Sequence, residues 1–203
     1  MESISIYRGF TLIELIVVLA IIGVITSITL NSQSSFNKSL LLSNTAYDIA
    51  LTLRSAETFG ISGKAIGSSV GVGYGINVQK GTPNSFILFA DLAGGASCSG
   101  MTPDCKPGDN KYGAGDQVIR TYTLGNSVTI SDFCAGPSCA SGSLTSLDIV
   151  FARPNPTPAI RGNGAVYSSA CIKIISPQGG VSNAKNISVL SSGAIVANSL
   201  SCP

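Results

Sequence analysis

The chain has 203 residues, enough for one domain of ordinary size plus an extra element. Twelve Lys and Arg against ten Asp and Glu leave a formal net charge of only +2, which by itself gives no sign of a nucleic-acid-binding or membrane-surface protein. The sequence contains no His, which excludes a Ser-His-Asp triad, a Cys-His dyad and any metal site with His ligands.

An apolar run near the beginning of the chain is the first strong pattern. Residues 1–9 are polar and carry Arg8, whereas residues 10–30, FTLIELIVVLAIIGVITSITL, contain a single charge, Glu14. As a helix, this run spans roughly 31 Å, close to the thickness of a hydrocarbon core. Because the next cation after Arg8 is Lys38, the charge pattern favours a cytoplasmic N-terminus and an exported C-terminal part. The residues alone predict a single-pass membrane anchor.

Glu14 is the residue that a simple anchor does not explain. A carboxylate inside a membrane segment is costly and usually has a partner. The alternative is that Glu14, five residues into the run, reaches back to the membrane interface.

The residues from Gly9 to Glu14, GFTLIE, followed by LIVVLAIIGVI, resemble the class III signal of type IV prepilins and type II secretion pseudopilins. In that family a dedicated membrane peptidase cuts after the Gly and methylates the new N-terminal Phe. The resemblance implies cleavage between Gly9 and Phe10 and N-methylation of Phe10. It also implies that Glu14, then the fifth residue, pairs with the N-terminal ammonium of a neighbouring subunit.

The same resemblance implies partners and a location. The partners are the prepilin peptidase, other pilin or pseudopilin subunits and the inner membrane. The protein would cross that membrane once, with its C-terminal domain exported, and would then join an extracytoplasmic filament.

Residues 31–60 continue the helical pattern. Apolar residues recur at spacings of 4, 3, 4 and 3, which defines one face of a helix. These are Leu42, Ala46, Ile49, Leu53 and Ala56. Gly60 and Gly63 are natural stop signals. The pattern predicts one nearly continuous helix from about residue 10 to residue 60, whose second half packs its apolar face on a sheet.

After Gly63 the sequence changes to short β-like runs with turn residues between them. The predicted strands are 69–79, 85–90, 117–124, 127–132, 146–152, 171–176, 186–191 and 194–198. The last two flank Ser192-Gly193, which predicts a hairpin turn. The fold class is therefore α+β, with a long N-terminal helix packed on a C-terminal antiparallel sheet.

The predicted organisation has four parts: a leader at 1–9, a transmembrane or filament-core helix at 10–30, the amphipathic half of the same helix at 31–62, and a disulfide-containing β-rich domain at 63–203. The stretches NTAYDIALTLRSAETFGI, VGYGINVQ, SFILFAD and KNISVLSSGAIVAN resemble the GspH/FimT-like branch of pseudopilins.

Six cysteines lie beyond the apolar segment: Cys98, Cys105, Cys134, Cys139, Cys171 and Cys202. An even number on one side of a membrane segment favours disulfides in an oxidising compartment. A metal site or free thiols are the alternatives, but the C-x6-C and C-x4-C spacings do not match the C-x2-C pairs of zinc sites. Proximity favours Cys98–Cys105, Cys134–Cys139 and Cys171–Cys202 among fifteen connectivities.

Acidic residues gather between Asp91 and Asp116, where Asp104, Asp109 and Asn110 lie among Gly, Ser and Pro. Calcium binding is conceivable because hard cations need clustered oxygen ligands. The spacing is not that of an EF-hand, and a solvated loop that uses Asp and Asn for turns is favoured. The GVGYG stretch at 71–75 alternates like a strand and is not a phosphate-binding loop. We therefore predict neither a metal nor a cofactor.

No nucleophile-base set lies in a recognisable motif, so we predict that the chain is not an enzyme. The leading hypothesis is a minor pilin or pseudopilin of a type IV pilus or a type II secretion pseudopilus. The alternative is a DNA-binding minor pilin of a competence pilus, for which Arg153, Arg161 and Lys173 are the best candidates. The tail SSGAIVANSLSCP has no basic residue, which weighs against DNA binding. A signal-anchored enzyme or adhesin is disfavoured by Glu14 behind Gly9-Phe10.

Overall fold

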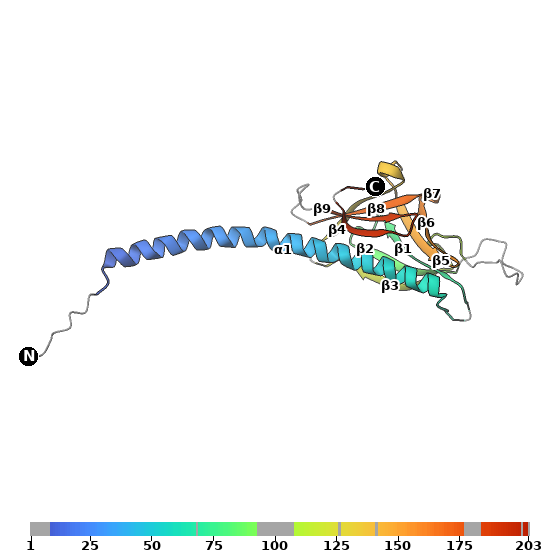
Figure 1. Cartoon of the computed structure of the whole chain (residues 1–203), viewed down its shortest axis with the longest axis horizontal. Coiled ribbons are helices and arrows are strands. Elements are labelled where there is room, and N and C mark those ends of the chain that lie inside the picture. The colour runs from blue at the N-terminus through green and yellow to red at the C-terminus, as the bar shows by residue number, and fades with distance from the viewer. Residues whose placement is uncertain are drawn as a thin grey trace, which may run out of the picture. The chain divides into compact units, whose positions relative to one another are not determined.

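A computed structural model describes residues 9–67, 69–92, 108–125, 127–140, 142–176, 184–199 and 201–202 (Figure 1). The chain forms two compact units, Met1–Ser39 and Leu40–Pro203. Helix α1 (Leu12–Ser62) contributes residues to both units. It is followed by ten strands and one short 3-10 helix, η1 (Pro137–Cys139), in the described part of the chain.

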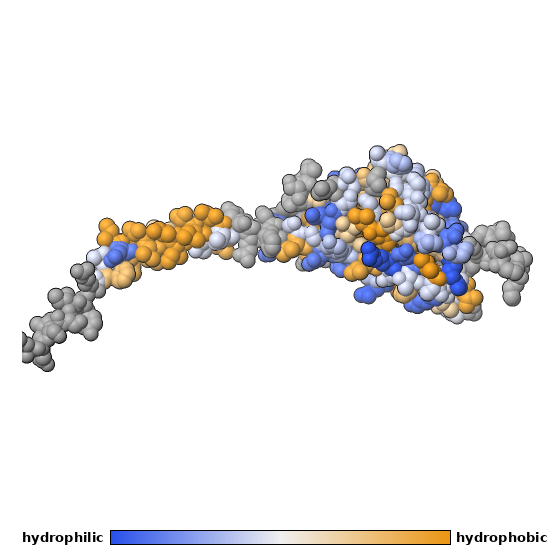
Figure 2. Space-filling view, viewed as in Figure 1, coloured by the Kyte–Doolittle hydropathy of each residue, from blue (hydrophilic) through white to orange (hydrophobic). Residues whose placement is uncertain are grey.

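Apolar residues dominate the first part of α1. Residues Leu12–Leu30 have a mean hydropathy of 2.6, and none of them is buried. Figure 2 shows this stretch as almost uniformly hydrophobic on its visible face. By length and composition it is a helix that can cross a membrane.

The C-terminal end of α1 is closed by a Schellman motif. The Gly63 amide donates to the Gly60 carbonyl and the Lys64 amide to the Phe59 carbonyl, at 3.3 and 3.1 Å. Gly63 has a φ of +63°, a conformation that Gly adopts without strain, so its predicted role as a stop signal is confirmed. The prediction for Gly60 is wrong. It lies inside the helix, where a side chain would collide with the Phe151 backbone.

The strands form two antiparallel sheets. The six-stranded sheet has the order β3-β2-β1-β5-β6-β7, and the four-stranded sheet has the order β10-β9-β8-β4. The bounds are Gly73–Gln79 for β1, Ser85–Asp91 for β2, Gln117–Thr123 for β3, Thr129–Ala135 for β4, Ser146–Ala152 for β5, Asn155–Gly162 for β6, Ala165–Tyr167 for β7, Ser169–Ile175 for β8, Ala184–Leu190 for β9 and Ile195–Ser199 for β10. The predicted α+β class is confirmed.

One hydrophobic core joins the second half of α1 to both sheets. All five residues of the predicted helical face, Leu42, Ala46, Ile49, Leu53 and Ala56, are buried in it. From β1, the alternate residues Tyr74, Ile76 and Val78 point into the same core, as the two-residue period of a strand requires. The Tyr74 ring makes an edge contact with Phe59 at 5.6 Å between ring centres.

Eight strands were predicted close to their observed positions, and two were missed. Strand β6 begins with Asn-Pro-Thr-Pro, and Pro normally argues against a strand because it cannot donate to the ladder. It is tolerated here because β7 pairs only with the second half of β6, so the first half has a neighbour on one side alone. Strand β7 is only three residues long. The hairpin at Ser192-Gly193 is confirmed, with Gly193 at a φ of +87°.

Every outer strand of the two sheets is short or irregular. The pairing register shifts within the β2–β3, β4–β8 and β9–β10 pairs, and β7 has three residues. Bulges and short edge strands discourage the addition of a strand from another molecule. The described sheet edges are therefore poor surfaces for association.

Candidate functional site

The start of α1 carries a reciprocal set of hydrogen bonds between Thr11 and Glu14. The Glu14 amide donates to Thr11 Oγ1 at 3.3 Å, while the Thr11 amide and hydroxyl donate to Glu14 Oε2 at 3.4 and 3.2 Å. This is a capping box, which satisfies amides that a helix start otherwise leaves unpaired. Glu14 therefore has a partner within its own chain, in addition to any partner in another subunit.

The sequence analysis missed this capping role. The signal was present as Thr-x-x-Glu directly before an apolar run, the usual signature of a capping box. Two explanations of Glu14 were predicted, a carboxylate that reaches the membrane interface and a carboxylate that pairs with another subunit. Neither explains the Thr-x-x-Glu pattern.

The predicted cleavage point lies just outside the helix. Gly9 and Phe10 have no regular secondary structure, and Phe10 is 81% exposed. A side chain built on Gly9 would meet no atom within 4 Å. The peptide bond between the two residues thus lies outside the helix, which begins at Leu12.

Four of the six cysteines form two disulfides in the structure, Cys134–Cys139 and Cys171–Cys202. These are two of the predicted pairings. The third predicted pair, Cys98 and Cys105, lies outside the described residues. Cys134 and Cys171 are opposite each other on β4 and β8, and the second bond ties the C-terminal end to β8.

Three of these sulfur atoms lie close enough together to hold a metal ion. Among the described residues, no other set of His, Cys, Asp or Glu side chains does so. The sulfurs of Cys134, Cys171 and Cys202 lie within 4.8 Å of one another. Because all three are bonded in disulfides, they are not the thiolates that a metal requires.

Asp91 is buried, contrary to the favoured interpretation of the acidic segment as a solvated loop. Its carboxylate accepts hydrogen bonds from the Asp109 and Asn110 amides at 3.1 and 2.8 Å. Burial raises the pKa of Asp91 to about 7, the two backbone hydrogen bonds oppose that rise, and Asp116 and Asp109 add to it. Asp104 lies outside the described residues.

Asp148 and Asp116 complete the attachment of the 108–116 segment to the sheet. Asp148 is buried and accepts from the Asn77 side chain at 2.7 Å and the Tyr112 amide at 3.0 Å. Asp116 accepts from the Leu92 and Gly113 amides. Burial raises the pKa of Asp148 as well. Sequence reasoning did not identify Asp148, because nothing in its strand distinguishes it from an exposed residue.

The chemistry of these carboxylates does not favour calcium. The groups that donate hydrogen bonds to them are N–H groups, which carry partial positive charge and stabilise an anion. A calcium site instead needs several oxygens directed at one point. The aspartates attach a loop to the outer face of β1, β2 and β5.

The three cations proposed for DNA binding come from different places. Arg153 lies in the turn between β5 and β6, Arg161 in β6 of the six-stranded sheet, and Lys173 in β8 of the four-stranded sheet. The Arg161 guanidinium donates to the Gly164 carbonyl at 3.0 Å. Lys173 lines a small pocket beside the disulfides, and neither arginine lines it. The three candidate cations thus lie on three different elements of the domain.

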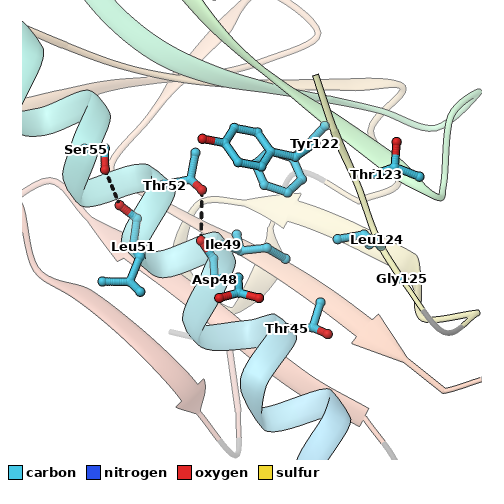
Figure 3. A pocket seen from close by; sticks show the side chains of 11 residues that line it. Thr45, Asp48, Ile49, Leu51, Thr52, Ser55, Tyr122, Thr123, Leu124 and Gly125 are labelled. Atoms are coloured by element: carbon cyan, nitrogen blue, oxygen red, sulfur yellow. Dashed lines mark hydrogen bonds between the residues drawn. The ribbon is translucent and has the colours of Figure 1, made fainter. Parts of the chain in front are cut away.

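A groove of about 350 Å³ lies between the second half of α1 and the end of β3 (Figure 3). Its helix side is formed by Thr45, Asp48, Ile49, Leu51, Thr52 and Ser55, and its sheet side by Phe86, Tyr122, Thr123, Leu124 and Gly125. Nothing in the sequence analysis pointed to it, since its two sides are far apart in the chain and only Ile49 belongs to the predicted core face.

Comparison with known proteins bears on the N-terminal segment. Residues 5–30 match the family model described as the prokaryotic N-terminal methylation motif. No curated protein and no solved structure matches the chain significantly. The chain thus begins with a type IV pilin-like prepilin signal, of the kind that a prepilin peptidase recognises, and continues into an α+β domain.

Proposed function

We propose that the chain is a minor pilin or pseudopilin, a structural and assembly subunit of a type IV pilus or a type II secretion pseudopilus. The observation that carries this proposal is the methylation motif at residues 5–30, together with the exposure of the apolar residues in its helical part, from Leu12 to Leu30. Pilin-like subunits are structural and not catalytic, which agrees with the prediction that the chain is not an enzyme.

The proposed assembly begins in the inner membrane. Arg8 remains on the cytoplasmic side, residues 10–30 span the bilayer and residues 63–203 are exported. The peptidase then cuts between Gly9 and Phe10, where the backbone is exposed and not yet helical. Removal of the leader creates an ammonium group at Phe10, which the same enzyme methylates.

Glu14 then has two successive roles in this proposal. Within the single subunit it caps α1 through Thr11, which lowers the cost of a carboxylate near the membrane. In the filament its charge pairs with the N-terminal ammonium of a neighbouring subunit. Two opposite charges that are each costly in lipid offset one another when they meet.

The exported domain fits an oxidising compartment. The Cys134–Cys139 and Cys171–Cys202 bonds support export, because disulfides persist outside the cytosol. We assign the domain to the GspH/FimT-like branch on the stretches that resemble it.

Substitutions of Glu14 test the proposal and separate its two roles. Glu14→Gln keeps the capping box, which accepts Glu or Gln, but removes the charge, whereas Glu14→Ala removes both. We expect both variants to insert and to be cleaved, and both to be lost from purified filaments. Incorporation of Glu14→Gln at the wild-type level would show that capping, and not charge pairing, is what Glu14 contributes. Incorporation of both variants would overturn the assembly role.

A further inference from the structure

The hydroxyl groups on the helix side of the groove between α1 and β3 already donate their hydrogens within the helix. Those of Thr45, Thr52 and Ser55 each donate to the helix carbonyl four residues earlier, at 2.9 Å. A hydroxyl has one hydrogen to donate, so only oxygen lone pairs remain for a ligand. The helix side of the groove therefore offers hydrogen-bond acceptors.

Asp48 adds a negative charge to the same wall. The other residues that line the groove are uncharged (Figure 3). The Asp48 side chain is exposed. The ion pair found among the described residues joins Lys111 to Asp109 and does not involve Asp48. No described cation therefore lies within 4.0 Å of the Asp48 carboxylate. An ionised carboxylate is itself an acceptor only, which makes this wall complementary to a cationic donor.

The rest of the groove suits the apolar stem of a long cationic side chain. Ile49 and Phe86 are buried beneath it, and the Tyr122 ring is stacked on Phe86 with ring centres 5.0 Å apart. Arginine and lysine bury their methylene stems against such surfaces while the charged end meets an acceptor. Arg120, whose guanidinium lies 4.9 Å from the Tyr122 ring centre, does not line the groove.

The rim has the character of a protein interface. Leu51 and Tyr47, one turn apart on α1, are 59% and 54% exposed. Interfaces concentrate their binding energy in a pocket that receives a residue such as Arg, surrounded by apolar and aromatic contacts. Since the outer strands are short or irregular, an incoming side chain is a better mode of contact here than an added strand.

We propose that this groove binds an arginine or lysine side chain of a partner protein, which pairs with Asp48 and lies along Tyr122 and Leu51. The proposal rests on the groove alone and does not depend on whether the partner is a filament subunit.

Photo-crosslinking in the full-length chain tests this inference in the membrane of intact cells. A photoreactive amino acid replaces Leu51 in one version and Thr123, across the groove, in another, and mass spectrometry identifies the crosslinked peptide. We expect both positions to capture one protein segment that contains an Arg or Lys. Asp48→Asn should lower the crosslink yield about tenfold, because it removes a charge-assisted hydrogen bond. Glu57→Gln, another carboxylate of α1 outside the groove, should leave the yield unchanged.

A charge exchange then decides the role of Asp48. Asp48→Lys should abolish the crosslink, and changing the identified partner residue to Asp should restore it. Because the Asp48 side chain is exposed and has no described cation beside it, neither Asp48→Asn nor Asp48→Lys should shift the thermal unfolding midpoint of the chain. Capture of lipid, capture of a segment without a cation, an unchanged yield with Asp48→Asn, or failure of the exchange would each overturn the proposal.

Discussion

The two halves of α1 use the same kinds of residue in opposite ways. In the first half, the apolar side chains from Leu12 to Leu30 are exposed on all sides of the helix. In the second half, the apolar face from Leu42 to Ala56 is buried against the sheets, while apolar residues outside that face, such as Leu51, remain exposed. The comparison shows that an apolar residue stabilises the folded domain only where the domain covers it. The described domain leaves the first half uncovered, and by length and composition that half can cross a membrane.

Leu53 and Leu51 provide the most direct test of this contrast within the domain. Leu53 is fully buried, whereas Leu51, two residues earlier, is 59% exposed. We expect Leu53→Ala to lower the free energy of unfolding by about 2–5 kcal/mol, because it leaves a cavity in the core. Leu51→Ala should change it by less than about 0.5 kcal/mol. Equilibrium unfolding of the full chain in detergent measures both, and similar losses for the two variants would contradict the assigned burial.

The disulfides sharpen the comparison, since the two described bonds both lie in the β-rich domain. The Cys171–Cys202 bond joins residues 31 apart and the Cys134–Cys139 bond residues 5 apart. By the chain-entropy model they contribute roughly 3.5 and 2 kcal/mol. We therefore expect the Cys171→Ser/Cys202→Ser double variant to unfold more easily than Cys134→Ser/Cys139→Ser. Non-reducing peptide mapping of the wild-type chain checks the pairing itself, and long-range pairings in place of these two would refute it.

Asp91 gives the domain a pH dependence. Its pKa is about 7 in the folded chain and has its ordinary value of 3.8 in the unfolded chain. Between these values the folded state holds a proton that the unfolded state has released. The stability that Asp91 contributes should therefore be fully present below about pH 4 and be lost as the pH rises to 7, by at most roughly 1.4 kcal/mol per pH unit.

The Asp91→Asn variant isolates that contribution from the other carboxylates. It keeps the size and one acceptor oxygen of the side chain but cannot ionise. The difference in unfolding free energy between wild type and variant should change steadily from pH 4 to pH 7 and level off above it. A difference that does not vary with pH would mean that Asp91 remains ionised in the folded chain.

Local patterns predicted the parts of the fold that depend on local chemistry. The helical face from Leu42 to Ala56 followed from spacing, and the end of α1 from the conformational freedom of Gly63. Strand β6 was not predicted, because Pro normally argues against a strand. The first half of β6 tolerates Pro because it pairs with a neighbour on one side alone, and that arrangement exists only in the assembled sheet. The burial of Asp91 and Asp148 also could not be predicted, since the 108–116 segment that covers them is fixed by long-range contacts. The capping role of Glu14 could have been predicted from Thr11.

Intact-mass spectrometry of the membrane-extracted protein tests directly whether this chain is processed as a prepilin. We expect a mature chain that begins at Phe10 and carries one additional methyl group. Fragmentation should place that group on the N-terminal amine. A chain that retains Met1, or one that begins after residue 30, would refute prepilin processing, because neither could present Glu14 as the fifth residue of a methylated N-terminus.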